Sequence, residues 1–358
     1  MSHKRPVVRL KPNADQSKIR HGFPWIYANE LVLDRRTQQI PAGTICVLEN
    51  SDRVGVAIVG FNPGSRIAAR VLDFDVDADI NGDWIAGRIQ AALGLRSTLF
   101  DAPFYRLVHA EADQLPGVVI DRFGATAVLQ PNAAWADVLK HEFAAALAQI
   151  DGIGHVFLNG TGRARGAERL DETRESLIGQ SDENPIKVTM NGATYFADIL
   201  GGQKTGLFYD QRPNHAFVQA LCRDARVLDV FCHVGGFGLA ALARGAAAVT
   251  FVDGSSDALD LVGNSLKYME ALSNTQCIKS DAFAYLADAQ AANTSFDVVI
   301  CDPPAFAPSK SALGAGLRAY EKLARMAARV VAPSGYLVLC SCSHAATVEK
   351  FTAACVRA

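Results

Sequence analysis

The second half of the sequence alternates apolar strands with helices, and this alternation constrains the fold more than any other feature. Five apolar runs of strand length lie at residues 226–231, 248–252, 275–278, 296–301 and 335–340. Helical stretches separate them, at residues 237–244, 256–269, 282–290 and 317–331. Buried apolar strands that alternate with helices are typical of a parallel sheet covered on both faces. The pattern predicts an α/β fold, a doubly wound Rossmann-like domain over residues 191–358.

Two smaller domains are expected before it. Residues 1–75 show short apolar alternations separated by turn-rich segments, which predicts a small β-rich domain. An acidic stretch at 73–79 marks the join to a second unit. Residues 80–190 then predict a central α+β domain, with helices near 84–95 and 135–150 and strands near 105–110, 117–121, 126–131 and 154–159. This central domain carries no chemical motif, which favours a structural or RNA-facing role.

Charge is distributed unevenly along the chain. The formal net charge is −2, but residues 1–72 carry eleven Lys and Arg against five Asp and Glu, a net of +6. The remainder carries 24 against 32, a net of −8. A basic domain on an acidic body indicates contact with a polyanion such as RNA. The alternative is a solvated basic surface with no partner.

The sequence gives no indication of a membrane or a secretory route. It lacks an uninterrupted apolar stretch of about 18 residues, and no apolar run follows its basic start. The eight cysteines show no paired Cys-x-x-Cys spacing. Reduced thiols in a cytoplasmic protein are therefore expected.

The first strand of the predicted parallel sheet runs into glycines. The segment reads Val227-Leu-Asp-Val-Phe-Cys-His-Val-Gly-Gly-Phe-Gly238. A strand followed by glycines and a helix lets the backbone approach a bound ligand closely. We expect Asp229, Phe231 and Gly235 to contact a cofactor. A merely tight connection is the alternative.

Acids at the next two strand ends strengthen this interpretation. Asp253 ends the second strand, 24 residues after Asp229, where a carboxylate can accept both hydroxyls of an adenosine ribose. Asp281 follows the third strand and is expected to face the adenine amino group. These acids could instead cap the following helices, and Asp281 could do both.

The fourth strand ends in Cys301-Asp-Pro-Pro-Ala-Phe306. Two prolines directly after an acid fix a rigid extended turn at the edge of the sheet. This turn predicts that Asp302 and nearby carbonyls recognise the edge of a planar base, beside the cofactor.

The fifth strand ends in Leu339-Cys-Ser-Cys-Ser-His344. A cysteine that faces the same edge can serve as a nucleophile if its thiolate is stabilised. Cys342 is predicted to have this role, whereas Cys340 is expected in the core. A zinc site formed by Cys340, Cys342 and His344 lacks a second ligand cluster, so no metal is expected.

These residues together resemble the ribosomal RNA large subunit methyltransferase I family of cytosine-5 methyltransferases. The resemblance covers nearly the whole chain. In the N-terminal part, Leu10-Lys-Pro, His21-Gly-Phe-Pro-Trp-Ile-Tyr27 and Gly60-Phe-Asn-Pro-Gly-Ser65 are similar to the family's RNA-binding PUA domain. The segment from Glu111 to Asp121 resembles its central domain. The most specific signature is Gly202-Gln-Lys-Thr-Gly-Leu-Phe-Tyr-Asp-Gln-Arg212.

The resemblance implies a cofactor, a substrate and a mechanism. The cofactor would be S-adenosyl-L-methionine, with Phe208 and Arg212 at its methionine end. The partner would be RNA of the 23S ribosomal type, and a homodimer is one expected state. Cys342 would add to carbon 6 of a flipped cytosine, and Asp302 would hydrogen-bond its ring nitrogen and amino group.

Three departures from the pattern matter. Phe231 and His233 occupy positions that are usually glycine in the general methyltransferase motif. Ala305 stands where some RNA cytosine-5 methyltransferases carry a second cysteine. The family fold also continues through two further strands beyond the position of Ala358, so this polypeptide is expected to be a piece of a longer protein.

Two rival functions remain open. Asp-Pro-Pro-aromatic turns also serve enzymes that methylate guanine nitrogens, which need no covalent adduct, so Cys342 discriminates between them. A non-catalytic RNA-binding or ribosome-assembly protein would explain the basic domain. It would not explain Asp229, Asp253 and Asp281 together.

Overall fold

The computed structural model describes residues 5–180, 184–201 and 206–358. The chain divides into two compact units. The N-terminal unit comprises Met1–Asn184 and Ile199–Thr205, and the C-terminal unit comprises Pro185–Asp198 and Gly206–Ala358. No helix in the described ranges is both long enough and apolar enough to cross a membrane.

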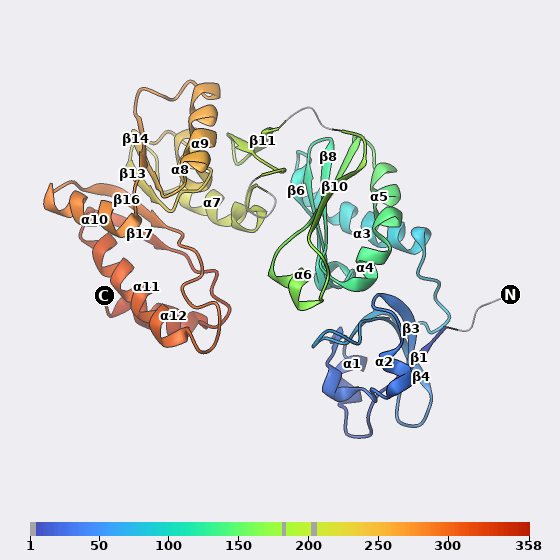
Figure 1. Ribbon diagram of the computed structural model, residues 1–358. Coiled ribbons are helices and arrows are strands. Elements are labelled where there is room, and N and C mark those ends of the chain that lie inside the picture. The colour runs from blue at the N-terminus through green and yellow to red at the C-terminus, as the bar shows by residue number, and fades with distance from the viewer. Residues whose placement is uncertain (1–4, 181–183, 202–205) are drawn as a thin grey trace. The chain divides into compact units, whose positions relative to one another are not determined.

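The N-terminal unit begins with a five-stranded sheet of order β1-β3-β4-β5-β2 (Figure 1). Its strands are β1 (Val7–Arg9), β2 (Trp25–Ile26), β3 (Thr44–Glu49), β4 (Gly55–Phe61) and β5 (Ala69–Asp73). Helices α1 (Gln16–Arg20) and α2 (Arg35–Gln38) are N-capped by Asp15 and Asp34. The Asp15 carboxylate accepts two backbone N–H groups and that of Asp34 accepts one, which the first helical turn would otherwise leave unsatisfied. The predicted small β-rich domain is confirmed.

A second five-stranded sheet, of order β10-β9-β8-β7-β6, forms the rest of this unit. The strands are β6 (Phe104–His109), β7 (Val118–Phe123), β8 (Thr126–Pro131), β9 (His155–Gly160) and β10 (Thr173–Ile178). Helices α3 (Gly82–Leu99), α4 (Ala134–Val138) and α5 (Lys140–Ala148) accompany them, with the short α6 (Arg163–Ala167) before β10. A single core of Ile85, Leu107, Trp135 and Phe143, among others, joins helices and sheet. This arrangement is the predicted α+β domain.

The prediction of one helix over residues 135–150 is wrong. The helix breaks at Leu139, whose φ of −97° and ψ of 21° leave the helical range. Trp135, on the first segment, is buried, and its indole N–H donates to the Pro116 carbonyl at 2.9 Å. The break therefore lets α4 and α5 bury different faces.

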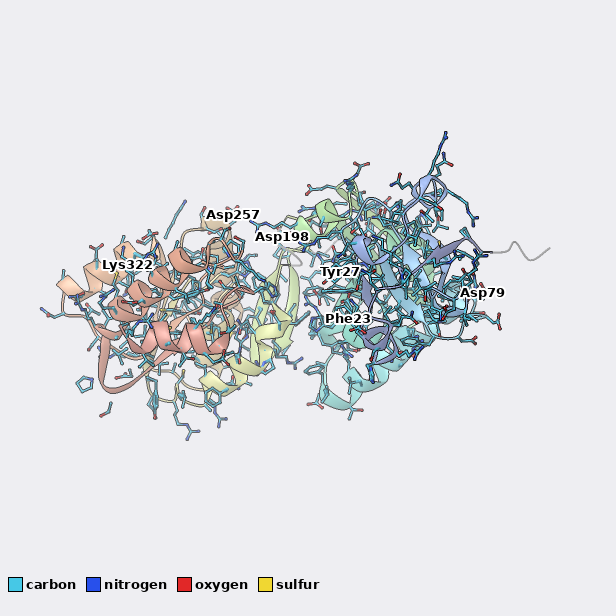
Figure 2. All side chains as sticks on the ribbon, turned by 90° about the horizontal axis from the view of Figure 1, so that it is seen from below. Phe23, Tyr27, Asp79, Asp198, Asp257 and Lys322 are labelled. Atoms are coloured by element: carbon cyan, nitrogen blue, oxygen red, sulfur yellow. The ribbon has the colours of Figure 1, made fainter. Side chains whose placement is uncertain are left out.

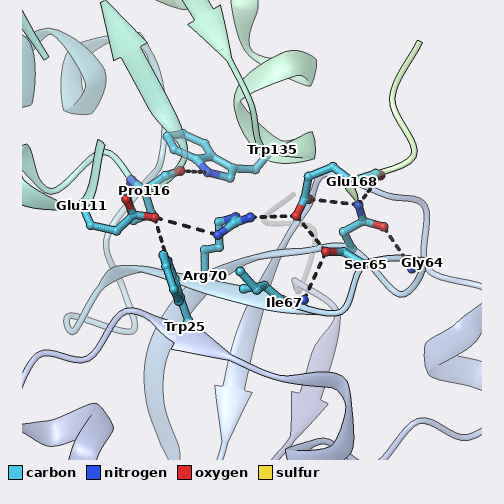
Figure 3. Close-up of polar contacts among 10 residues, drawn as sticks. Trp25, Gly64, Ser65, Ile67, Arg70, Glu111, Pro116, Trp135 and Glu168 are labelled. Atoms are coloured by element: carbon cyan, nitrogen blue, oxygen red, sulfur yellow. Dashed lines mark hydrogen bonds and ion pairs between the residues drawn. The ribbon is translucent and has the colours of Figure 1, made fainter. Parts of the chain in front are cut away.

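A buried polar network joins the two sheets of the N-terminal unit (Figure 3). Glu168, directly after α6, accepts hydrogen bonds from Arg70 and Ser65, both at 2.7 Å. Its carbonyl accepts a bond from the Asn62 side chain at 2.9 Å. Glu168 is 4% exposed and Arg70 is 8% exposed, so the ion pair is shielded from solvent. A shielded, multiply bonded pair holds the small sheet against the central domain.

The C-terminal unit contains a five-stranded sheet of order β15-β14-β13-β16-β17, and every neighbouring pair is parallel. The strands are β13 (Arg226–Val230), β14 (Ala248–Asp253), β15 (Thr275–Lys279), β16 (Phe296–Cys301) and β17 (Val331–Leu339). The first four coincide closely with the predicted strands. The fifth, β17, begins at Val331 rather than at residue 335, because α11 ends at Ala328 and not at residue 331 as predicted. The expected doubly wound α/β sheet is confirmed.

Helices cover both faces of this sheet (Figure 1). Helices α7 (Arg212–Gln219), α8 (Gly236–Ala243) and α9 (Ser256–Tyr268) form one layer, and α10 (Ala282–Ala291), α11 (Leu313–Ala328) and α12 (Val348–Val356) form the other. Leu228, Val230 and Val299 of the strands pack against Leu286 and Leu323 of the second layer. The alternate residue, Asp229, faces the first layer, because successive side chains of a strand point to opposite faces.

A hairpin, β11 (Ile186–Met190) and β12 (Ala193–Ala197), precedes the parallel sheet. Its turn residues, Asn191 and Gly192, have φ values of 52° and 76°. The hairpin spans the boundary expected at residue 190, and β12 contacts α8 and α9. Both strands therefore belong to the C-terminal unit.

Candidate active site

The candidate site lies at the carboxyl ends of the parallel strands, where the strand order reverses. Strands β14 and β16 flank β13, and helices cross over in opposite directions from this point. Ligands of open α/β sheets bind at such switch points. The backbone of Asp302 donates to the Val230 carbonyl at 3.3 Å, and that of Cys340 donates to the Cys301 carbonyl at 2.9 Å. The segments after β13, β16 and β17 are thus neighbours.

The turn after β13 has an unusual backbone. Phe231, His233 and Gly235 have φ values of 61°, 50° and 82°. Positive φ is uncommon for bulky residues and persists where surrounding structure enforces it, often at functional sites. Phe231 and His233, which stand where the general motif has glycine, thus keep the backbone conformation that favours glycine. The turn ends at Gly235, the N-cap of α8.

Asp229 is completely buried beneath this turn. Its Oδ2 accepts the Gly238 N–H at 2.8 Å, and its Oδ1 has no hydrogen-bond partner among the residues that the structure describes. Burial, together with the nearby Asp302 and Asp253 carboxylates, raises the pKa of Asp229 to about 7. A buried carboxylate oxygen without a donor costs free energy. Asp229 is therefore suited to receive a cationic donor from a ligand.

Asp253 and Asp281 both bond the backbone of the site. Asp253 Oδ2 accepts the His233 N–H at 2.8 Å and Oδ1 accepts the Ser255 N–H at 2.9 Å, so this carboxylate ties the end of β14 to the glycine turn. Asp281 is the N-cap of α10 and accepts the Phe283 and Ala284 N–H groups at 2.9 and 3.0 Å. The helix-capping interpretation is confirmed for Asp281, and its side chain is exposed.

The signature before α7 reaches the same site. Its residues 202–205 lie outside the described ranges. Phe208 packs with its ring centroid 5.1 Å from that of His233. The side chain of Gln211 donates to Asp302 Oδ2 at 3.2 Å. Arg212 begins α7, and its carbonyl accepts the Asn191 side chain at 2.9 Å.

Cys342 lies beside the Asp-Pro-Pro turn. Its Sγ is 3.9 Å from the carbonyl oxygen of Pro303, and its side chain is exposed. Burial raises the pKa of Cys340 to about 12 and raises that of Cys301 as well. Of the three thiols at these strand ends, Cys342 is the accessible one. Over the described ranges, no cluster of three or more His, Cys, Asp or Glu side chains is arranged to hold a metal ion.

Sequence reasoning missed several residues of the site. His215 of α7 is buried against Phe237, with ring centroids 4.4 Å apart, and burial lowers its pKa to about 4. A Cβ on Gly236 would lie 2.7 Å from the His215 ring. Tyr195 donates to the Gly236 carbonyl at 3.2 Å. These side chains pack against the glycine turn at Gly236. No local motif in the sequence marks them.

A separate group of cationic and aromatic side chains lies in the N-terminal unit. Lys18 Nζ is 5.3 Å from the ring centroid of Phe23 and 5.7 Å from that of Tyr27. Phe23 is 38% exposed and packs edge-on against Trp25 at 6.0 Å. Figure 2 labels Phe23 and Tyr27 on this small β-rich domain. The Lys18 ammonium is also paired with Glu30. An exposed aromatic ring such as that of Phe23 offers a stacking surface to a base.

Two family descriptions match parts of the chain. A PUA-like domain matches residues 8–74, which confirms the expected PUA-like domain. A family described as Conserved hypothetical protein 95 matches residues 213–339. The structure also resembles a protein of Streptococcus mutans named as a SAM-dependent methyltransferase, with a TM-score of 0.80 and 19% identity over 98% of this chain and 89% of that one. This likeness shows that the two share a fold.

Curated relatives match nearly the whole chain. Ribosomal RNA large subunit methyltransferase I of Tolumonas auensis is 32% identical over 350 residues, which cover 96% of this chain and 87% of the relative. The protein of the same name from Vibrio vulnificus is 32% identical, with 94% and 85% covered. A ribosomal RNA large subunit methyltransferase of Deinococcus radiodurans is 31% identical, with 99% and 89% covered. At this identity and coverage, the chain belongs to the ribosomal RNA large subunit methyltransferase I family.

Proposed function

We propose that the chain binds S-adenosylmethionine and methylates carbon 5 of a cytosine in large-subunit ribosomal RNA through a covalent adduct of Cys342. The names of the curated relatives support the RNA and the methyl transfer. The observation that carries the cytosine chemistry is the exposed Cys342 thiol, 3.9 Å from Pro303 O of the Asp-Pro-Pro turn.

The residues at the strand ends fit the cofactor. A buried, unsatisfied Asp229 oxygen beneath a strained turn suits the ammonium group of the methionine moiety. Phe231 and Gly235 would bring the turn backbone close to the ligand. Phe208 and Arg212 would line its methionine end, as the family signature implies. When bound, S-adenosylmethionine supplies a methyl group that its sulfonium makes electrophilic.

Two further acids would hold the adenosine moiety. Each Asp253 oxygen already accepts one backbone N–H and retains a lone pair for a ribose hydroxyl. The exposed Asp281 uses Oδ1 for both N–H groups of α10, and Oδ2 would accept the adenine amino group. Capping a helix and binding a base are compatible for the same carboxylate.

Cys342 and Asp302 would carry the chemistry on the base. The Cys342 thiolate adds to carbon 6 of the flipped cytosine, and the electrons of the 5,6 double bond move to carbon 5. Carbon 5 then bonds the methyl carbon as the methyl–sulfur bond breaks. Asp302, held by Gln211, would accept a hydrogen bond from the amino group of the cytosine and orient its ring. A proton acceptor then removes the carbon-5 proton, the double bond re-forms and the thiolate leaves. Water near Asp302 is our candidate for that proton acceptor.

The rival is methylation of a guanine nitrogen. It is favoured by one observation, the aromatic Phe306, which follows the two prolines after one intervening residue and has its ring centroid 6.4 Å from that of Phe231. Guanine nitrogens carry lone pairs and require no thiol. The exposed Cys342 would then have no chemical role, so we favour the cytosine reaction.

Nucleoside analysis tests the proposal. Bare and ribosome-assembled large-subunit RNA would be incubated with the protein and S-adenosylmethionine labelled in its methyl group, then digested to nucleosides. We expect the label in 5-methylcytidine. Label confined to a methylguanosine would contradict the proposal and establish the rival.

A further inference from the structure

The segment that carries Cys342 is held by a closed ring of hydrogen bonds. The Ser343 N–H donates to Ser341 Oγ at 3.2 Å, and the Ser341 hydroxyl donates to the Tyr320 hydroxyl at 2.9 Å. The Tyr320 and Ser343 hydroxyls are bonded at 2.8 Å, which closes the ring. Cys342 is the single residue between the two serines. The Tyr320 hydroxyl therefore fixes the position of Cys342 in space, through the serine on either side of it.

The phenol at the centre of this ring cannot move freely. Tyr320 belongs to α11 and is 2% exposed. Its ring packs against those of Phe306 and Phe351, with centroids 4.9 and 5.0 Å away. Close packing in the core restricts the movement of such a side chain. Tyr320 thus gives the ring a rigid anchor in the helix layer.

The same ring is tied to the Asp-Pro-Pro turn. The Ala307 N–H donates to the Ser343 hydroxyl oxygen at 2.9 Å, and Ser343 is 5% exposed. Phe306, which packs on Tyr320, lies two residues after the last residue of that turn, Pro304. The Cys342 thiol is 3.9 Å from Pro303 O. The ring therefore sets the distance between the thiol and the turn that bears Asp302.

We propose that Tyr320 is a positioning residue for Cys342, acting through Ser341 and Ser343. The inference rests on the proposed function, in which Cys342 must approach carbon 6 of a base held at Asp302. Covalent attack requires the reacting atoms about 3–3.5 Å apart, and a displacement of about 1 Å can cost about 100-fold in rate. A fixed hydroxyl ring limits such displacement, whereas packing alone would not set the register of the exposed segment.

Tyr320→Phe tests this role, because it removes the hydroxyl and keeps the packed ring. We expect kcat for methyl transfer to fall about 10- to 100-fold, with the KM for RNA and the Kd for cofactor within about twofold of wild type. Iodoacetamide should alkylate Cys342 several-fold faster, because its segment is loosened. Peptide mass spectrometry would follow this rate, with the exposed Cys277 of β15 as an internal control. Tyr336→Phe, on the exposed side of β17, is the matched variant and should behave as wild type.

The serines provide an independent arm. Ser341→Ala should also lower kcat. The double variant Ser341→Ala with Tyr320→Phe should be no slower than Tyr320→Phe alone, because both changes open the same ring of hydrogen bonds. Wild-type kcat in Tyr320→Phe, beside an inactive Cys342→Ala, would overturn the positioning role and leave the proposed function intact. A parallel loss of kcat, cofactor binding and melting temperature would also overturn it, since that marks a general structural defect. Full activity of Cys342→Ala would instead overturn the proposed function.

Discussion

Asp229 shows how one side chain can be shaped for a ligand. It is buried, one of its oxygens lacks a donor in the described part of the chain, and its pKa is raised to about 7. A ligand ammonium at that oxygen would stabilise the ionised form and lower this pKa again. Cofactor binding should then favour the ionised carboxylate. It should be strongest between about pH 7 and 8, because an α-amino group loses its proton above about pH 8. It should weaken, with release of a proton, as the pH falls toward 5.

Calorimetry at pH 5.5, 7 and 8.5 in buffers of different ionisation enthalpy measures both effects. The proton release should be largest at the lowest pH, where most free protein carries a protonated Asp229. Asp229→Asn should bind weakly and lose this pH dependence. Equal cofactor affinity and no proton release across this pH range would show that the ammonium group of the cofactor does not bind at Asp229.

Asp253 has a double role, since it bonds the glycine turn as well as the proposed ribose. Asp253→Ala should weaken cofactor binding by about 2 kcal/mol, through the loss of charge-assisted hydrogen bonds. Its bond to the His233 N–H predicts a lower melting temperature in addition. Asp257→Ala, on the exposed side of α9 and labelled in Figure 2, is the control and should bind normally. Wild-type affinity of Asp253→Ala would exclude this carboxylate from the site.

At the scale of elements, burial explains what the sequence predicted well. The three central strands β13, β14 and β16 are mainly apolar because helices cover both faces of the sheet there, so their sequences were easy to identify as strands. Strand β10 escaped prediction because Thr173–Ile178 is largely polar and becomes a strand only by pairing with β9. The hairpin β11–β12 had a usable signal, since Asn191-Gly192 between alternating apolar residues is typical of a tight hairpin turn.

The candidate site could be predicted as far as local sequence marks it. Acids and glycines at strand ends predicted that Asp229, Asp253 and Gly235 lie close together, because the topology of a parallel sheet brings its strand ends together. Tyr320 could not be identified in this way. On the apolar face of a helix it resembles any core tyrosine, and its partners Ser341 and Ser343 become neighbours only in the folded chain.

The polar junction of the N-terminal unit should contribute strongly to stability. Glu168→Ala would remove the nearer carboxylate of buried Arg70, at 2.7 Å, and leave that of Glu111 at 3.8 Å. Removing one member of a buried ion pair costs about 3–5 kcal/mol. Urea unfolding should therefore show a lower midpoint for this variant. The exposed Asp101→Asn provides a control that should unfold as wild type. An unchanged midpoint for Glu168→Ala would show that the junction carries little free energy.

At the scale of the whole molecule, the charge asymmetry predicts how RNA binds. Exposed arginines of the basic region lie at Arg20, Arg35, Arg36, Arg53 and Arg66. If they contact phosphates, affinity should fall steeply with salt, because bound counterions are released. Changing all five to Gln should weaken binding and reduce the slope of log K against log salt by about 0.9 for each phosphate that is no longer neutralised.

A matched variant removes the same number of positive charges from the other unit, so that the effect of their position can be separated from that of the net charge. It changes five exposed arginines of the C-terminal unit to Gln: Arg223, Arg226, Arg244, Arg325 and Arg329. Filter binding between about 50 and 200 mM salt spans the informative range. A larger reduction of the slope in this second variant than in the first would place the main RNA-binding surface on the C-terminal unit.

The central claim is that Cys342 forms a covalent bond with cytosine during methyl transfer. Carbon 5 of cytosine becomes nucleophilic only after addition at carbon 6, so the thiol is chemically required. The decisive measurement uses RNA that carries 5-fluorocytidine, because fluorine at carbon 5 blocks the final elimination. With S-adenosylmethionine present, the wild-type protein should form a complex with this RNA that survives denaturing electrophoresis. Cys342→Ala should form no such complex and transfer no methyl group. Cys340→Ala should form the complex and should methylate unmodified RNA. Normal methyl transfer by Cys342→Ala, with no trapped complex in the wild type, would contradict the covalent mechanism.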